Sequence, residues 1–520
     1  MNLHLTRAFW AKVLLAAFLA AGGLFACLTP ATRDYTWLSF SSGDAAYAFY
    51  DDFPVQSVKS DWIFKCLGIL ALGWIHRFHP KTRNTGFSLW IPGLFLAGGA
   101  ALVISWSTAL MVFLVLFALV YPWNEERTAN EQSRIILAGL VFIALILRLE
   151  KLPNVWSQPL QPDVIQYVQL SQQMTWFYDT GHREPFLAWI NYLLSFLIPV
   201  PSQAAQTGYW PIRVFTVAAS GAVVGMMYIL GRQFFSHRVA FLGALMAALN
   251  KALIYRSLQG LRLEILTVAI LAVLWLALRK PEKPGNAFRQ GTALGIAAGI
   301  LLLIRTASIP FLALVFGWAW IAKKRTLREC AIAAGVGFVL ASPYYFYCWQ
   351  QYGDPMYSGS YHINKFYYMT VFGTGAPDTS QVPFVTAGEV MFQIYPWYKS
   401  LALTVEGILD TLFGRFALRL FYLPFSVALI GCSLVGYIRW VKNPENWGFL
   451  LSVGLLLGPM AFVLAMLNHS PVTFDWRTVA HLFPFMAYAT GEGLFYLTDM
   501  VWGKRGENFH NCEDREALPK

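Results

Sequence analysis

The sequence predicts an all-α integral membrane protein, built as a polytopic helix bundle of about 14 spans. Two observations lead to this fold class. Of the 520 residues, 57% are hydrophobic and only 13% are charged, and apolar runs of helical length recur along the whole chain. These runs are continuously apolar rather than alternating, which favours membrane-spanning helices over a β-barrel.

A span needs roughly 20 mostly apolar residues to cross a hydrocarbon core about 30 Å thick. The second and seventh runs are short, so a merged or re-entrant pair is an open alternative. The first run follows Arg7 and Lys12 and is expected to be a retained helix rather than a cleaved signal peptide. In order, the expected spans lie near residues 13–29, 62–76, 87–104, 106–122, 135–150, 211–231, 238–254, 261–278, 290–305, 308–322, 329–347, 418–438, 447–467 and 480–501.

Basic residues in the short loops set the expected orientation. If the N-terminus is cytoplasmic, the basic turns fall on the cytoplasmic side, in agreement with the positive-inside rule. Both termini are then cytoplasmic, and the polar loop near residues 160–190 faces the outside. We therefore expect a multi-pass protein of the inner (plasma) membrane with its functional site on the extracytoplasmic side. The basic turns are at residues 76–83, 231–238, 278–289, 323–328, 439–442 and 503–505.

Charge and cysteine content exclude some classes of function. The net charge of +11 is spread over the short turns, which indicates topology signals and contacts with anionic membrane lipids rather than nucleic-acid binding. The six cysteines show no ligand spacing, so neither a disulfide framework nor a metal site is expected. We expect no cofactor, and the sequence does not indicate a divalent metal.

The chain divides into three parts. Residues 1–130 carry four spans and form a module of unknown role. Residues 131–347 hold the core of the membrane domain together with the first polar outer loop. Residues 348–520 contain a second outer segment and the C-terminal spans. That segment suits one or two helices lying at the membrane interface, with Trp397 and Tyr398 in the headgroup zone.

Ionisable residues near lipid-spanning helices must be paired, hydrated or functional, because their burial in lipid is costly. Four clusters of them lie at the outer ends of helices in the expected orientation. Arg148, Glu150 and Lys151 close the fifth span and are interpreted as snorkelling basic side chains with a counter-ion. The candidates for function in the four clusters are Asp163, His182, Arg183, Glu184, Arg256, Arg262, Glu264, Arg305 and Arg477.

The chemistry of these residue types suits a lipid-phosphate substrate. The planar fork of arginine matches phosphate oxygens. A lipid-linked phosphosugar presents its anomeric carbon at the membrane surface, where one carboxylate could act as general base while basic residues hold the departing phosphate. Asp163 fits the base, although its place after Pro162 also suits a helix N-cap. Arg262, Arg305 and Arg477 fit the phosphate contacts.

Residues from about 131 to 500 resemble the polytopic GT-C glycosyltransferases, in particular bacterial members akin to the protein O-mannosyltransferases and the aminoarabinose transferase of lipid A. The resemblance rests on the order and outer placement of several segments. They read LQPDVIQYVQ, REPFLAWI, GLRLEILTVAILAVLWLAL, LLIRTASIPFL, YGDPMYS and DWRTVAHLFPFMAYATGEGL. Val164 follows Asp163 where the family often has glutamate.

The resemblance implies a GT-C-like fold whose outer loops carry short interfacial helices. It also implies transfer of a sugar from a polyprenyl-phosphate donor to a lipid, glycan or protein acceptor outside the cytoplasm. Asp163 and Glu184 would be catalytic. The residues expected to bind substrate are Tyr167, His182, Arg183, Arg256, Arg262, Glu264, Arg305 and Arg477.

Three other classes stay open. A transporter or flippase of a lipid-linked or anionic substrate also uses charges at helix ends, and predicts charges near the midplane and pseudo-symmetric halves. A lipid-linked oligosaccharide ligase is chemically close, and the outer segment at residues 348–415 is compatible with it. A scaffold without catalytic activity gives no reason for acids at buried helix ends.

Overall fold

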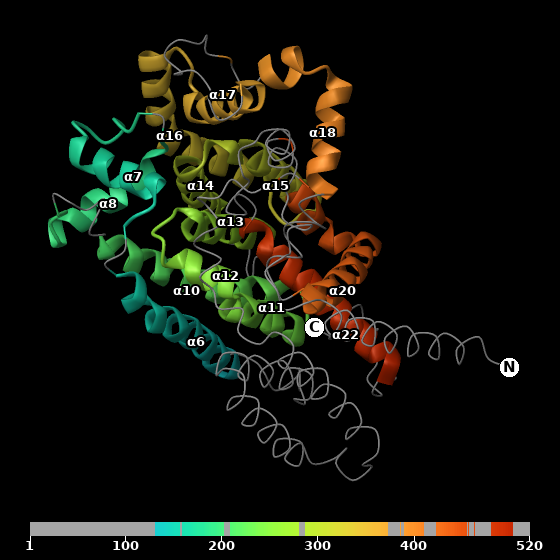
Figure 1. The fold of residues 1–520 in the computed structure, drawn as a ribbon. Helices are drawn as coiled ribbons and strands as arrows, with labels where there is room; N and C mark the ends of the chain where they lie inside the picture. Colours follow the sequence, from blue (N-terminus) through green and yellow to red (C-terminus); the bar gives the residue numbers. More distant parts are fainter. Residues whose placement is uncertain are drawn as a thin grey trace.

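The computed structural model describes residues 131–156, 159–181, 183–201, 209–279, 287–372, 385, 389–409, 423–454, 456, 462 and 480–502. All regular secondary structure in these residues is helical (Figure 1), which confirms the all-α class. The first four expected spans and the larger part of the span expected near 447–467 lie outside the described residues.

The helices of the described part follow the expected spans closely between residues 131 and 352, and the span expected at 238–254 is divided into two helices. In chain order the α-helices are α6 (Glu131–Val155), α7 (Pro162–Gln173), α8 (Pro185–Leu197), α10 (Trp210–Phe234), α11 (His237–Leu249), α12 (Lys251–Ser257), α13 (Leu263–Leu278), α14 (Ala287–Ile304), α15 (Ile309–Ile321), α16 (Leu327–Tyr352), α17 (Tyr357–Phe372), α18 (Trp397–Leu409), α20 (Leu423–Lys442) and α22 (Phe483–Trp502). Short helical turns are η2 (Thr306–Ser308), η4 (Glu389–Ile394), η6 (Pro444–Asn446) and η8 (Ala480–Leu482).

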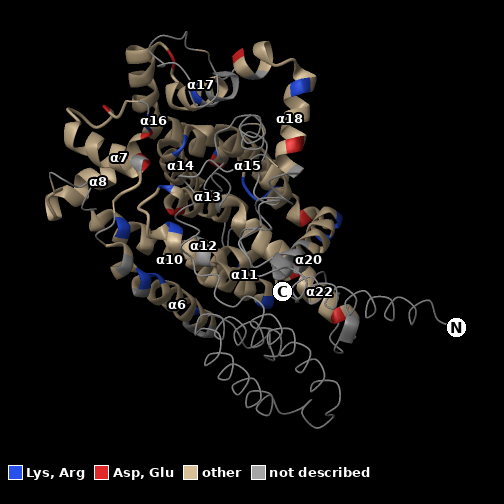
Figure 2. Ribbon diagram, in the orientation of Figure 1, with Lys and Arg blue, Asp and Glu red and all other residues tan. Residues whose placement is uncertain are grey.

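Three of the described helices, α10, α14 and α16, are long and apolar enough to cross a membrane by length and composition. Shorter apolar helices include α8, α11 and α13. The described residues thus support the membrane class, and they do not confirm a bundle of about 14 spans. Figure 2 shows that charged positions are sparse along the described helices, as expected for segments that bury or expose mainly apolar side chains.

Local capping explains why one expected span is broken. The chain leaves the helical conformation at Asn250, where φ is −67° and ψ is 114°. The Asn250 side chain then accepts a hydrogen bond of 3.0 Å from the backbone N–H of Leu253. An asparagine side chain that accepts a hydrogen bond from the backbone N–H three residues later is a favourable N-cap. The result is that α11 ends and α12 begins at the same residue.

The centre of the bundle is built on α10, which packs against α6, α11 and α13, while α11 also packs against α22. In Figure 1, α6 and α10 to α12 lie in the lower half, α16 and α17 at the top, and α13 and α14 between them. The inner side of α10 is fully buried at Val224, Met227 and Leu230. Burial of such side chains supplies the packing that holds the helices at fixed positions.

Close helix packing depends on small residues between α14 and α16. A β-carbon added at Gly295 would lie 2.7 Å from the carbonyl oxygen of Ala333 and 2.7 Å from the β-carbon of Val336. Glycines spaced four residues apart let two helix backbones approach closely inside a membrane. Gly291 and Gly299 make the same kind of contact one turn away on either side.

Candidate functional site

The polar loop forms a pair of short helices, α7 and α8, that pack on each other beside α14. Asp163 lies in the first turn of α7, directly after Pro162, and the N-cap of this helix is Gln161. The N-cap interpretation of Asp163 is therefore wrong, although a carboxylate in the first turn still interacts favourably with the helix dipole. The Asp163 side chain is 46% exposed, so solvent and a substrate can reach it.

Arg183 joins Asp163 to the start of α8. Its Nη2 atom donates to Oδ1 of Asp163 over 2.7 Å, and its Nε atom donates to Oε1 of Gln166 over 3.0 Å. The guanidinium carbon lies 5.3 Å from the centre of the Tyr167 ring, within the range of a cation–π contact. The backbone carbonyl of Arg183 accepts from the Thr180 hydroxyl over 2.6 Å. Both the backbone and the guanidinium of Arg183 are thus fixed by hydrogen bonds.

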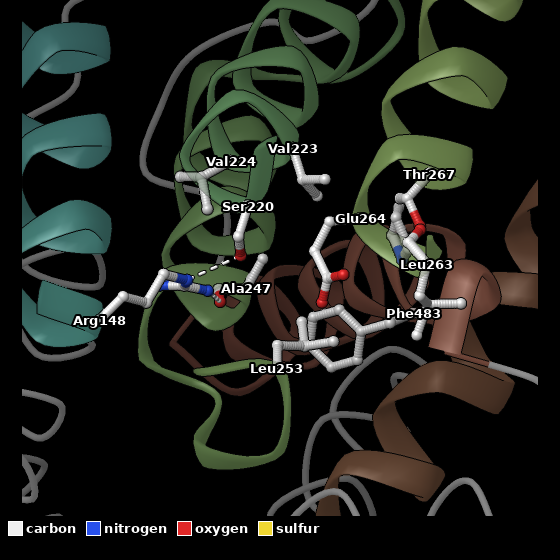
Figure 3. A pocket seen from close by; sticks show the side chains of 11 residues that line it. Arg148, Ser220, Val223, Val224, Ala247, Leu253, Leu263, Glu264, Thr267 and Phe483 are labelled. Atoms are coloured by element: carbon white, nitrogen blue, oxygen red, sulfur yellow. Dashed lines mark hydrogen bonds between the residues drawn. The ribbon is translucent and has the colours of Figure 1, made fainter. Parts of the chain in front are cut away.

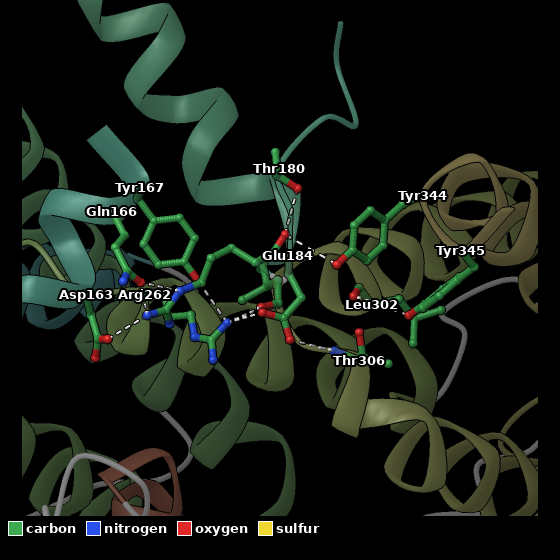
Figure 4. Close-up of polar contacts among 12 residues, drawn as sticks. Asp163, Gln166, Tyr167, Thr180, Glu184, Arg262, Leu302, Thr306, Tyr344 and Tyr345 are labelled. Carbon is green, nitrogen blue, oxygen red and sulfur yellow. Dashed lines mark hydrogen bonds and ion pairs between the residues drawn. The ribbon is translucent and has the colours of Figure 1, made fainter. Parts of the chain in front are cut away.

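Glu184 and Arg262 form the buried centre of the site (Figure 4). Their carboxylate and guanidinium make an ion pair, and the Glu184 side chain is only 3% exposed. Arg262 also donates to the hydroxyl oxygen of Tyr167 over 3.0 Å. The backbone N–H of Thr306 donates to Oε1 of Glu184 over 3.3 Å. Four separate segments of the chain therefore meet at this pair.

Electrostatics keep Glu184 ionised. Burial alone would raise the pKa of its carboxyl, but the positive charges of Arg262 and His362 and the hydrogen bonds to the carboxylate outweigh burial and lower the pKa to about 2. For Tyr167, burial raises the pKa of the phenol, and Arg262 offsets this only in part. At neutral pH the site thus holds a charged carboxylate next to a neutral phenol.

A left-handed turn places Arg262. Gly260 has φ of +78°, and a β-carbon there would lie 3.2 Å from Ile212 and 3.3 Å from Val164. Only glycine adopts this backbone region without strain. The turn redirects the chain from α12 into α13, so that Arg262 precedes α13 and reaches the Glu184 carboxylate between α7 and α14.

Further basic residues surround the ion pair. Arg305, between α14 and η2, interacts electrostatically with Arg262 and Glu184. His481 of η8 interacts in the same way with Arg305. We call the set Asp163, Tyr167, Arg183, Glu184 and Arg262 the Asp163 cluster, and Arg305 lies at its edge.

A second group of charges lies elsewhere. Arg148 is buried and bonded inward to Ser220 and to backbone carbonyls. The snorkelling interpretation of Arg148 is therefore wrong. Glu264 interacts electrostatically with Arg148 and Arg256, and Arg256 donates to the side chain of Gln259 over 3.0 Å. These three charges do not join the contacts of the Asp163 cluster.

The structure thus brings together six of the ten expected site residues and separates two, Arg256 and Glu264. His182 and Arg477 lie outside the described residues. Sequence reasoning missed Gln166 and Thr306, which contact the charges directly, and Tyr344, whose hydroxyl donates to the Arg183 carbonyl over 3.3 Å. The polar Gln166, one helical turn from Asp163, was the signal that could have been used.

The donor set does not point to a metal within the described ranges. No group of three or more histidine, cysteine, aspartate or glutamate side chains there could hold an ion. Each of the two carboxylates of the Asp163 cluster is paired with an arginine. Comparison with protein-family models, with curated proteins and with solved structures found no match to this chain.

Proposed function

We propose that this protein is a membrane glycosyltransferase that moves a sugar from a polyprenyl-phosphate donor to an acceptor on the extracytoplasmic side. The observation that supports the proposal is the Asp163 cluster. It sets one half-exposed carboxylate, paired with Arg183, beside the buried ion pair of Glu184 and Arg262, and Arg305 interacts electrostatically with that pair. A reaction at a lipid surface needs this combination of an accessible base and fixed positive charge.

The roles in the reaction follow from exposure and pairing. Asp163 accepts the proton of the acceptor hydroxyl, whose oxygen then forms the new bond to the anomeric carbon. The bond from that carbon to the phosphate oxygen breaks with inversion, and the polyprenyl phosphate leaves with the bond electrons. Arg305, together with the positive charge of Arg262, stabilises the phosphate. Asp163 finally releases its proton to water.

Glu184 has a positioning role in this scheme. Its carboxylate is 3% exposed and fully engaged by Arg262 and Thr306, so it does not reach a substrate. It fixes the guanidinium of Arg262, and Arg262 in turn fixes the hydroxyl of Tyr167. The proposal thus assigns the catalytic proton transfer to Asp163 alone.

The experiment that tests the proposal compares Asp163→Asn with the parent in membranes supplied with radiolabelled polyprenyl-phosphate sugars. We expect the variant to lose roughly 100-fold or more of the transfer rate, as for loss of a general base, with unchanged abundance. Asp499→Asn, at an exposed position near the far end of α22, is the matched control and should keep the parent rate. Equal rates for Asp163→Asn and the parent, or no transfer by the parent from any hexose or pentose donor, would refute the proposal.

One observation favours a second candidate, a transporter or flippase of a lipid-linked or anionic substrate. Arg148 and Glu264 are buried among helices of the bundle, and interior charges are typical of transport pathways. The two functions differ in their product. A transporter would move the labelled lipid across a vesicle membrane unchanged, whereas the transferase would break the bond between sugar and phosphate.

A further inference from the structure

A small cavity lies between α6, α10, α13 and the start of α22 (Figure 3). None of the residues that line it belongs to the Asp163 cluster. It offers about 20 Å³ to the centre of a water molecule, which is room for about one water. Most of its wall is apolar. The residues of this wall are Val223, Val224, Ala247, Leu253, Leu263, Phe483 and Pro484, and the polar lining is Arg148, Ser220, Glu264 and Thr267.

Glu264 points into this cavity (Figure 3). The residue is 5% exposed. One carboxylate atom, Oε2, has no hydrogen-bond partner among the described residues, and the carboxylate is stabilised by a hydrogen bond from its own backbone N–H. A buried polar atom without a partner costs free energy, so the site requires something in the cavity that can bind it.

Arg148 faces Glu264 across the cavity without touching it. Its Nε atom donates to Ser220 over 2.7 Å, and its Nη1 and Nη2 atoms donate to the carbonyls of Ala144, Ala248 and Ala247 over 2.9, 3.1 and 3.3 Å. These acceptors hold the guanidinium of Arg148 on the side of the cavity opposite Glu264. Arg148 therefore acts on Glu264 only through its charge.

The remaining walls add one further charge. Arg256, from α12, interacts electrostatically with Glu264 and donates to Gln259. The lining residues from α10, α11 and α22 carry no ionisable side chain. Within the described part of the chain, the charge state of Glu264 is therefore set by the apolar wall, Arg148 and Arg256.

Ser220 completes a path for a proton. Its oxygen accepts from Arg148, so its own O–H can donate to a molecule in the cavity. A water molecule there can accept from Ser220 and donate to Oε2 of Glu264. If Glu264 is protonated, the same water accepts from the carboxyl instead. Both charge states of Glu264 are then fully hydrogen-bonded.

We infer that this cavity is a hydrated proton-binding site, in which one water molecule links Ser220 to Glu264 and the Glu264 carboxyl takes up and releases a proton. Ionisable groups inside membrane bundles commonly have this function. The inference does not depend on the proposed sugar transfer, because the two groups of residues share no contact.

The test is infrared difference spectroscopy on the full-length protein in lipid nanodiscs, titrated with acid and base. We expect the stretching band of a protonated carboxyl in the parent, lost as the pH is raised and absent in Glu264→Gln. Glu184→Gln is the matched control and should leave this band intact, because Glu184 is ionised in its pair with Arg262.

A second variant keeps the test decisive if Glu264→Gln does not fold. Ser220→Ala leaves the carboxyl in place but removes both a hydrogen bond to the water and the acceptor of Arg148 Nε, so the band should shift in frequency. The inference is overturned if no protonated-carboxyl band depends on Glu264 at any pH at which the protein stays folded. A band that is unshifted in Ser220→Ala would likewise overturn the link through water.

Discussion

Replacing Glu184 with glutamine tests the central contact of the Asp163 cluster. Glutamine keeps the size of the side chain and removes the charge, so Arg262 loses its buried counter-ion. Removing one partner of a buried ion pair costs roughly 3–5 kcal/mol. The Arg262 side chain is 22% exposed and keeps Tyr167 as an acceptor, so we expect a loss at the lower end, about 3 kcal/mol.

The chain contains a matched control for this change. Glu492 of α22 pairs with Arg439 of α20 over 2.9 Å, but the Arg439 side chain is 42% exposed. Exposed ion pairs contribute about 0–1 kcal/mol. Glu492→Gln makes the same chemical substitution in a pair that is less buried, with the Glu492 side chain 22% exposed against 3% for Glu184, and we expect it to lower the free energy of unfolding by less than Glu184→Gln does.

The assay is unfolding of the purified protein in mixed micelles with increasing denaturing detergent, followed by circular dichroism. Glu184→Gln should shift the midpoint clearly further than Glu492→Gln. If the two variants lose equal stability, or if Glu492→Gln loses more, the ion pair of Glu184 and Arg262 does not contribute the roughly 3 kcal/mol expected of a buried pair.

Two further predictions concern the same chain. The pKa of Glu184 is lowered from 4.5 to about 2, so the stability that the ionised carboxylate contributes is complete above pH 4.5 and is lost as the pH falls toward about 2. Unfolding midpoints measured down this range should fall more steeply for the parent than for Glu184→Gln, and parallel slopes would contradict the lowered pKa of Glu184. Gly295→Ala should lower the free energy of unfolding by about 1–3 kcal/mol, because the new β-carbon would lie 2.7 Å from the carbonyl oxygen of Ala333. Gly335→Ala, where a β-carbon has nothing within 4 Å, should be neutral or stabilising, and equal unfolding midpoints for the two variants would refute the packing argument.

Apolar run length allowed most helices of the described part to be predicted. The runs near 211–231, 290–305 and 329–347 correspond to α10, α14 and α16, because a helix that buries or exposes apolar side chains on all its faces needs a continuous run. The break at Asn250 was missed. Asparagine inside an apolar run has a preference for helix caps, but whether that preference prevails depends on packing with α6.

The candidate site was predicted in part. Arg183 and Glu184 are adjacent, and Asp163 lies 20 positions earlier in the same polar loop, so their grouping could be expected. The pairing of Glu184 with Arg262 could not, since these residues are 78 positions apart and only the packing of α7, α8 and α13 decides the partner.

Helix geometry explains why Glu264, expected like Arg262 to bind substrate, does not join the Asp163 cluster. Residues separated by two positions do not face the same side of a helix. Once α13 begins at Leu263, Glu264 must point away from the direction taken by Arg262. If the first residue of α13 had been known, the two-residue spacing of Arg262 and Glu264 would have been enough to predict that they point to different sides.

The contacts of Arg148 have a consequence for how this protein is made. Its acceptors Ala247 and Ala248 are carbonyls at the end of α11, which the break at Asn250 leaves without partners in their own helix, and they are synthesised about 100 residues later. Until then α6 carries a charge whose insertion into lipid costs roughly 2.5–3.5 kcal/mol. We therefore expect α6 to be held stably only once α11 has been made.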